Sequence, residues 1–261
     1  MRLLNDYVPT LIQILVLVYI LIRLYRMTVR TGRTVSVIFF SFAIVSSLLS
    51  DLYWVVFDLL HPMTRMPFAA NEIAEWAIFL SLGATLAGLE GVFGAPARAD
   101  MIGAILFTAA NVALWIAWSG EWLQDILTGI LYAYYLIHVV RHMRQTGMLS
   151  GMGRIVTGLT CLLILAANAA TFAVPKRYTG MLDLAAYVLL ILTALYLAVR
   201  SVIALTGGGD PQSAISLAFA ANAWNFAFLY MSSGIFYNVA MGFFTFSVLL
   251  MYAAIRREAT V

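Results

Sequence analysis

Charged residues are scarce in this chain. Of its 261 residues, 10% are charged and 63% are hydrophobic, and the mean hydropathy is +0.94. A soluble domain carries roughly 25% charged residues, so this chain could not cover a core with polar surface. The composition excludes a soluble enzyme domain and predicts one integral membrane domain over residues 1–261. The net charge of +3 gives no indication of nucleic-acid binding.

Reactive groups are also few. The single cysteine, Cys161, lies in an apolar run, which excludes a disulfide framework and a cysteine metal pair. The single lysine, Lys176, lies in a predicted loop, which excludes a rhodopsin-like pigment with a buried Schiff base. HExxH, GxSxG and phosphate-binding glycine loops are absent. We predict no catalytic residue, no metal, no cofactor and no enzyme activity. A third alternative is an intramembrane enzyme that acts on lipid, in which two carboxyl groups serve as general acid and general base.

The histidines support the prediction that there is no metal site. His138 and His142 are four residues apart, a spacing that can place two imidazoles on one metal. His61 belongs to the opposite end of the predicted bundle, so the three side chains cannot share an ion. Arg141 and Arg144 lie beside the pair, which indicates a cluster at the membrane interface.

Long apolar segments dominate what is present. A helix needs about 20 mostly apolar residues to cross a bilayer, and prolines, glycines and charged clusters divide the chain into nine such segments. The sequence predicts an all-α, polytopic transmembrane bundle of about nine spans, with eight or seven if a segment is interfacial or re-entrant. The predicted spans are Tyr7–Tyr25, Thr34–Leu60, Phe68–Phe93, Met101–Trp118, Glu121–Met143, Met152–Val174, Tyr178–Val202, Gln212–Met231 and Ile235–Ile255.

The basic residues predict the orientation. Lys and Arg concentrate beside the cytoplasmic ends of spans. Nine spans with an outside N-terminus place 11 of the 15 basic residues on the inner side. We therefore expect a multi-pass protein of the plasma membrane with its N-terminus outside and its C-terminus inside.

A recurring motif suggests helical-hairpin repeats. An Ala-Ala-Asn sequence ends at Asn111, Asn168 and Asn222, in three spans predicted to run outward. An aromatic residue follows each Asn by four positions. The alternative is that small residues and Asn recur because they pack helices tightly in a membrane.

The acidic residues gather in the predicted outer half, which holds eight of the twelve. Asp51 and Glu75 lie deepest, roughly 12 to 14 Å below the outer ends of their helices at 1.5 Å per residue. Ionisable groups at such depth are costly and normally face a cavity or a partner. Four others complement helix dipoles in the first turns, and we interpret them as structural: Glu72, Glu121, Asp125 and Asp183.

The neighbours of the two deep acids extend them into a predicted site. Asp51, Trp54 and Asp58 are spaced to share one helical face, and Glu72 and Glu75 share another. If these faces meet, the carboxylates and Trp54 line an outward-facing acidic cleft that binds a cation or a proton. An aromatic ring could hold an organic cation, and neighbouring carboxylates that share a proton would make the site sensitive to external pH.

Asn71 belongs to the same predicted site. The alternative to an open cleft is a closed hydrogen-bond network in which Asp51 bonds to Asn111 or to tyrosine side chains. The first functional hypothesis is a small carrier or binder of a cation, proton or cationic small molecule. The second is a sensor or partner subunit that binds a ligand in this cleft and docks a separate cytoplasmic protein on the basic inner loops.

Overall fold

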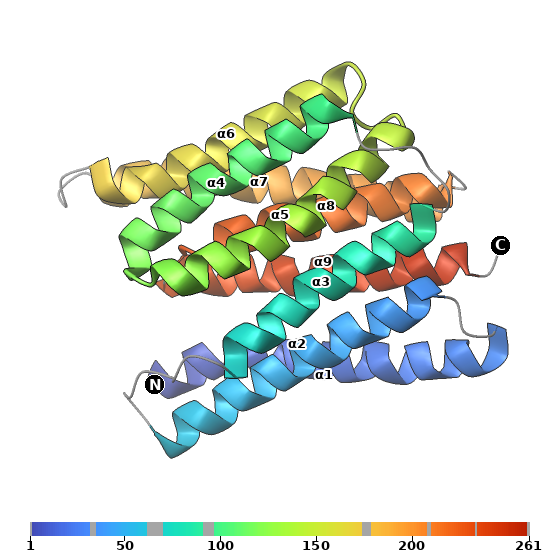
Figure 1. Cartoon of the computed structure of the whole chain (residues 1–261). Helices are drawn as coiled ribbons and strands as arrows, with labels where there is room; N and C mark the ends of the chain where they lie inside the picture. Colours follow the sequence, from blue (N-terminus) through green and yellow to red (C-terminus); the bar gives the residue numbers. More distant parts are fainter. Residues whose placement is uncertain are drawn as a thin grey trace.

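A computed structural model describes residues 2–31, 35–61, 70–90, 97–173, 179–207, 210–232 and 234–259. Over these residues the chain is all-helical, which confirms the predicted helix bundle. Successive helices run in opposite directions, and the chain ends lie at opposite ends of the bundle (Figure 1). The helices are α1 (Arg2–Thr31), α2 (Val35–Leu60), α3 (Ala70–Glu90), α4 (Arg98–Ser119), α5 (Trp122–Gln145), α6 (Met152–Ala173), α7 (Thr179–Thr206), α8 (Pro211–Leu229) and α9 (Gly234–Glu258).

Seven of these helices, α1 to α6 and α9, are long and apolar enough to cross a membrane, so the chain is a membrane protein. In α7 the segment Ile191–Thr206 is also apolar. We call the end of the bundle that holds the start of α1 the N-terminal face. The end that holds the last turn of α9 is the C-terminal face (Figure 1).

Helix α8 lies inside the bundle. Every residue from Ala214 to Phe228 is buried, and α8 contacts α5, α6, α7 and α9. A helix that is covered on all sides has no lipid-facing stripe. It can therefore carry Asn222 and Asn225 where a peripheral helix would carry Leu or Ile.

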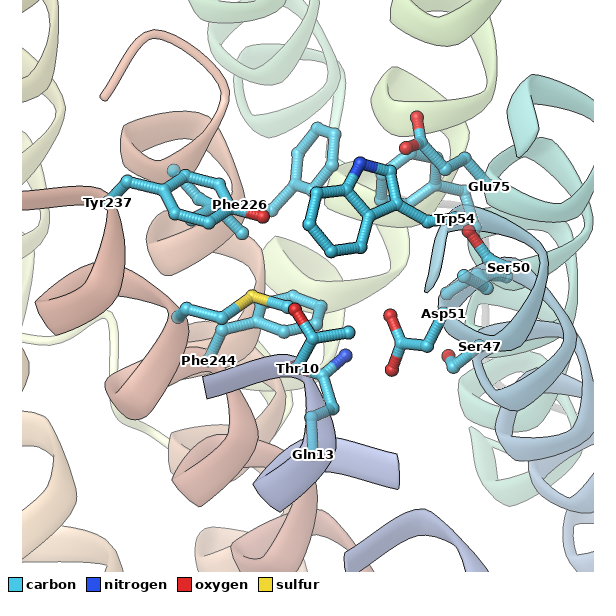
Figure 2. Close-up of a pocket in the computed structure, with 14 residues that line it drawn as sticks. Thr10, Gln13, Ser47, Ser50, Asp51, Trp54, Glu75, Phe226, Tyr237 and Phe244 are labelled. Atoms are coloured by element: carbon cyan, nitrogen blue, oxygen red, sulfur yellow. The ribbon is translucent and has the colours of Figure 1, made fainter. Parts of the chain in front are cut away.

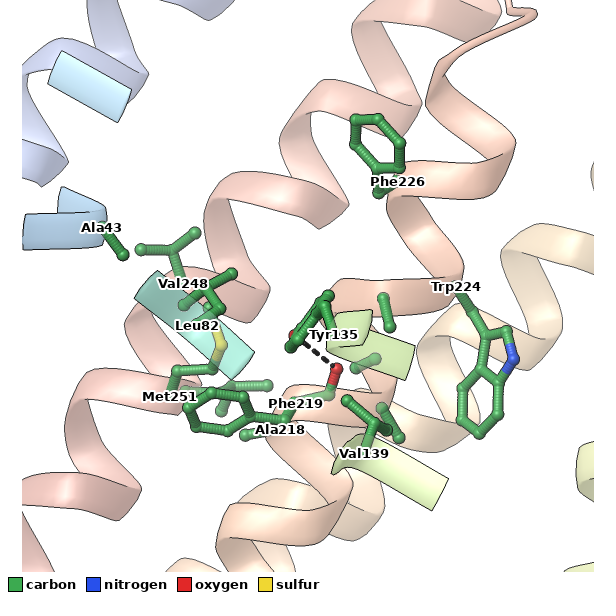
Figure 3. Close-up of a cluster of buried hydrophobic side chains, with 14 of the residues drawn as sticks. Ala43, Leu82, Tyr135, Val139, Ala218, Phe219, Trp224, Phe226, Val248 and Met251 are labelled. Carbon is green, nitrogen blue, oxygen red and sulfur yellow. Dashed lines mark hydrogen bonds between the residues drawn. The ribbon is translucent and has the colours of Figure 1, made fainter. Parts of the chain in front are cut away.

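Polar contacts from α5 fix the position of α8. The Tyr132 hydroxyl donates to the carbonyl of Ala223 at 2.8 Å, and the Tyr135 hydroxyl donates to the carbonyl of Phe219 at 3.1 Å. Figure 3 shows the second bond within the apolar core. Both tyrosines are fully buried. Each hydroxyl satisfies its hydrogen-bonding requirement in a region that contains no bulk water.

Turn chemistry explains two of the helix ends. Gly120 caps the end of helix α4, and its φ of 77° lies in the left-handed region that glycine adopts without strain. Asp210 caps the start of helix α8, and its side chain accepts from the backbone N–H groups of Gln212 and Ser213. Pro211 follows at the first helical position, where a backbone N–H would have no acceptor within the helix, so the N–H that proline lacks is not needed.

The three Asn residues of the recurring motif are buried and hydrogen-bonded. Asn168 Nδ2 donates to Asn111 Oδ1 at 3.1 Å and so joins α6 to α4. Asn222 Nδ2 donates to Ser247 Oγ at 3.0 Å and joins α8 to α9. These contacts are helix-packing contacts, and duplication of helical hairpins stays a prediction.

Candidate functional site

A cavity of about 130 Å³ lies between α1, α2, α3, α8 and α9 in the half of the bundle nearer the N-terminal face. Asp51 and Trp54 reach it from α2, Glu75 from α3, and Gln13 from α1 (Figure 2). A water molecule needs roughly 10 to 15 Å³ in this measure. The cavity therefore has room for several waters or for one small ligand.

Asp51 is a buried acid at the wall of this cavity. Only 9% of the residue is exposed, and its Oδ2 atom has no hydrogen-bond partner among the described residues. Figure 2 shows the carboxylate pointing into the space between α2 and Gln13. A buried carboxylate oxygen without a donor is costly, so this atom is the position at which a bound cation or proton would be most favourable.

Gln13 supports the other side of the Asp51 carboxylate. The Thr245 hydroxyl lies 2.9 Å from Gln13 Oε1 and 2.8 Å from the carbonyl of Met241, and its single hydrogen is shared between these two acceptors. The contact with Gln13 orients the amide so that its NH₂ group faces Asp51, to which the Gln13 side chain hydrogen-bonds (Figure 2). Residues of α1 and α9 therefore position an acid that α2 carries.

The electrostatic character of the cavity is negative. Its described lining contains two carboxylates and no lysine, arginine or histidine. The hydroxyl of Ser47 also lines it but donates to the carbonyl of Ala43 on its own helix at 2.9 Å. Two acids in a lining of low dielectric, with no basic side chain among the lining residues that the structure describes, favour occupancy by positive charge.

Aromatic rings form much of the remaining lining. Trp54, Tyr237, Phe226 and Phe244 all contribute to it. In the view of Figure 2, the Trp54 indole lies between the Asp51 and Glu75 carboxylates. A ring face beside carboxylates can hold an organic cation through a cation–π contact.

The structure brings together three of the six residues predicted for the site, namely Asp51, Trp54 and Glu75. Glu72 is buried but does not line the cavity. The side chain of Asn71 lies outside the described residues.

Asp58, the sixth predicted residue, is engaged elsewhere. Its carboxylate accepts a hydrogen bond from the Tyr7 hydroxyl of α1. The Tyr7 ring packs on Trp54 with centroids 5.6 Å apart. Asp58 therefore contributes to the contact between α1 and α2 beside the cavity.

Sequence reasoning missed Gln13, Thr245 and Tyr237. Thr10 and Gln13 are the uncharged polar side chains of the apolar run from Tyr7 to Ile22, and both are buried. An amide inside a membrane span is itself a signal of a polar partner. The identity of that partner depends on packing between helices that are distant in the sequence.

Asp125 forms a separate network that is closed. This fully buried acid accepts from Ser119 Oγ at 2.6 Å and from the Tyr230 hydroxyl at 2.5 Å. Both carboxylate oxygens therefore have a donor. The contacts join α4, α5 and the end of α8, in agreement with the structural interpretation of Asp125.

The histidine pair is part of helix packing at the C-terminal face. His142 Nδ1 lies 2.6 Å from Ser216 Oγ, and His142 Nε2 lies 2.9 Å from Gln212 Oε1. His138 packs edge-on against Tyr134. Among the described residues, no group of three His, Cys, Asp or Glu side chains could hold a metal ion.

Comparison with known proteins gives no relative from which to infer a function. The chain matches no protein-family model, no curated protein and no solved structure. The acidic cavity is the feature of the described chain from which a function can be inferred.

Proposed function

We propose that this protein is a small carrier or binder of a cation, a proton or a cationic small molecule, and that the ligand occupies the Asp51 and Glu75 cavity. The observation that carries the proposal is the Asp51 Oδ2 atom, which is buried and lacks a donor at the wall of a cavity. A positive ligand supplies the missing partner.

The lining determines what kind of ligand fits. Two carboxylates supply charge, the Gln13 amide holds Asp51 in place, and Trp54 and Tyr237 supply ring faces. A cavity of about 130 Å³ admits a metal cation with some of its water, or a compact ammonium ion. Protons compete for the same carboxylates, so acidification weakens binding of any other cation.

A sensor would use the same cavity but needs a separate protein at the basic residues of the C-terminal face. Two of these residues already bond within the chain. Arg144 Nη2 donates to Asp100 Oδ1 at 2.8 Å, and Arg23 Nε lies 3.4 Å from the Tyr252 hydroxyl. We therefore keep the carrier as the first proposal, and we place it in the plasma membrane.

Uptake by proteoliposomes tests the proposal. Sodium, tetramethylammonium and protons are offered in turn to vesicles that contain the wild-type protein or Asp51→Asn. We expect at least one of them to enter faster than into protein-free vesicles, and the variant to remove that difference. Equal uptake rates in protein-free vesicles, in wild-type vesicles and in Asp51→Asn vesicles would contradict the carrier. If a stoichiometric protein partner also co-purified from the native membrane, the sensor would be favoured.

A further inference from the structure

A second cavity, of about 300 Å³, lies between α4, α5 and α6 and shares no lining residue with the acidic cavity. Phe107, Leu136, Val140 and Cys161 form its walls, and Trp224 of α8 also lines it. The volume is at the lower end of the roughly 300 to 1,000 Å³ typical of ligand pockets. We call this cavity the α4–α6 groove.

The groove exists because two glycines face it. Gly103 on α4 and Gly158 on α6 both line it. A Cβ atom built on either glycine would meet no atom within 4 Å. The two helices therefore leave open space where larger side chains would fill the contact.

The groove borders the apolar surface of the bundle. Helices α4 and α6 lie side by side along one edge of the bundle (Figure 1). Their exposed faces carry Ile102, Leu106, Leu159 and Leu162. In a membrane this edge is in contact with lipid acyl chains, so a lipid tail can enter the groove from the side.

Positive charge lies at the end of the groove nearer the C-terminal face. Arg144, Arg154 and Asp100 line it there. Asp100 pairs with Arg144, so these two charges offset each other. The exposed Arg154 guanidinium donates a hydrogen bond from Nε to the carbonyl of Leu149 at 3.4 Å. The groove therefore ends on Arg154, which has no carboxylate partner in the part of the chain that the structure describes.

We propose that the α4–α6 groove binds an anionic phospholipid, with the phosphate on Arg154 and an acyl chain against Phe107, Leu136 and Trp224. Arginine matches phosphate through several N–H donors held in one plane. The apolar walls of the groove can pack against the acyl chain of the lipid, and the net positive charge at its end can bind the anionic headgroup. This site is independent of the proposed cation site.

Native mass spectrometry of the purified full-length protein tests the proposal with phosphatidylglycerol and phosphatidylcholine of identical acyl chains. Wild type should bind phosphatidylglycerol more tightly. Gly158→Leu adds side-chain volume to the groove at a position where a Cβ atom meets no atom within 4 Å, and it should weaken phosphatidylglycerol binding about tenfold. Arg154→Gln should lower the affinity for phosphatidylglycerol to that for phosphatidylcholine, also about tenfold. Gly242→Leu, at an exposed glycine of α9 with equally open space, is the matched control and should bind as wild type.

Three results would overturn the proposal. The first is equal binding of both lipids by wild type. The second is a Gly158→Leu variant that binds phosphatidylglycerol as wild type does. The third is binding of inorganic phosphate that Arg154→Gln abolishes and Gly158→Leu leaves unchanged, because that pattern describes an anion site without a lipid.

Discussion

At the scale of single residues, Asp51 and Asp125 are both buried acids but differ in what their oxygens contact. Each Asp125 oxygen accepts a hydrogen bond, from Ser119 or from Tyr230. Asp51 has the Gln13 side chain as a partner, and its Oδ2 atom has none among the described residues. This difference supports a structural role for Asp125 and the proposed ligand-binding role for Asp51.

Removal of a hydroxyl from the Asp125 network should destabilise the protein. Tyr230→Phe leaves a buried carboxylate oxygen without its donor, which costs about 1 to 3 kcal/mol. The free energy of unfolding in detergent micelles measures this loss. Tyr196→Phe, at a tyrosine of α7 that is 45% exposed, is the matched control and should leave stability unchanged. An unfolding free energy for Tyr230→Phe equal to that of the control would contradict the assignment.

Sequence reasoning found the two deep acids and missed the residues that support them. Depth within a span depends only on counting along one helix, so Asp51 and Glu75 could be identified from the sequence. Gln13 and Thr245 are 232 positions apart, and their contact depends on how α1 packs against α9. Asp58 shares a helical face with Asp51, but its contact with Tyr7 could not be predicted from spacing.

At the scale of elements, the predicted spans agree with the helices, but their ends differ. Helix α1 runs from Arg2 to Thr31, beyond the predicted Tyr7–Tyr25. The predicted span ends at Tyr25, directly before Arg26, yet Arg26 lies within the helix. Arg23, inside the predicted span, contacts the Tyr252 hydroxyl. Long basic side chains can extend toward an interface without ending a helix, so charge predicts the end of a span better than the end of its helix.

The buried position of α8 predicts sensitivity to added volume. Ala218 has no exposed surface and packs within the core. Ala218→Leu inserts three carbon atoms into a filled space, which should cost about 1 to 3 kcal/mol or more. Ala109→Leu on the exposed face of α4 is the control and should leave stability within about 0.5 kcal/mol of wild type.

Thermal unfolding of both variants in the same detergent measures the difference. If Ala218→Leu were as stable as Ala109→Leu, α8 would not be enclosed by the other helices. The sequence indicated α8 as a span, but its central position depends on four neighbouring helices and could not be predicted from composition.

At the scale of the whole molecule, the span count decides which side of the membrane holds the connection between α7 and α8. With nine spans and an outside N-terminus, this connection is inside. If α7 and α8 did not cross, it would be outside. Thr206 is exposed at the end of α7 and reports on this position.

Labelling of an introduced cysteine distinguishes the two topologies. In a Cys161→Ala background, Thr206→Cys should react with a membrane-impermeant maleimide from the cytoplasmic side alone. Ser150→Cys and Trp122→Cys, both at exposed positions, are the inside and outside controls. Labelling of Thr206→Cys together with Trp122→Cys would show that seven helices cross.

Equilibrium binding to the purified protein tests the central claim most directly. Sodium, tetramethylammonium and protons are titrated into wild type, Asp51→Asn, Glu75→Gln and the control Asp58→Asn, whose site contacts Tyr7 outside the cavity. We predict that wild type and Asp58→Asn bind at least one of the three alike. Asp51→Asn and Glu75→Gln should bind it about 30-fold more weakly, because loss of one partner of a buried charge pair costs about 2 kcal/mol or more. Equal binding by wild type and Asp51→Asn, or no binding of any of the three by wild type, would contradict the claim.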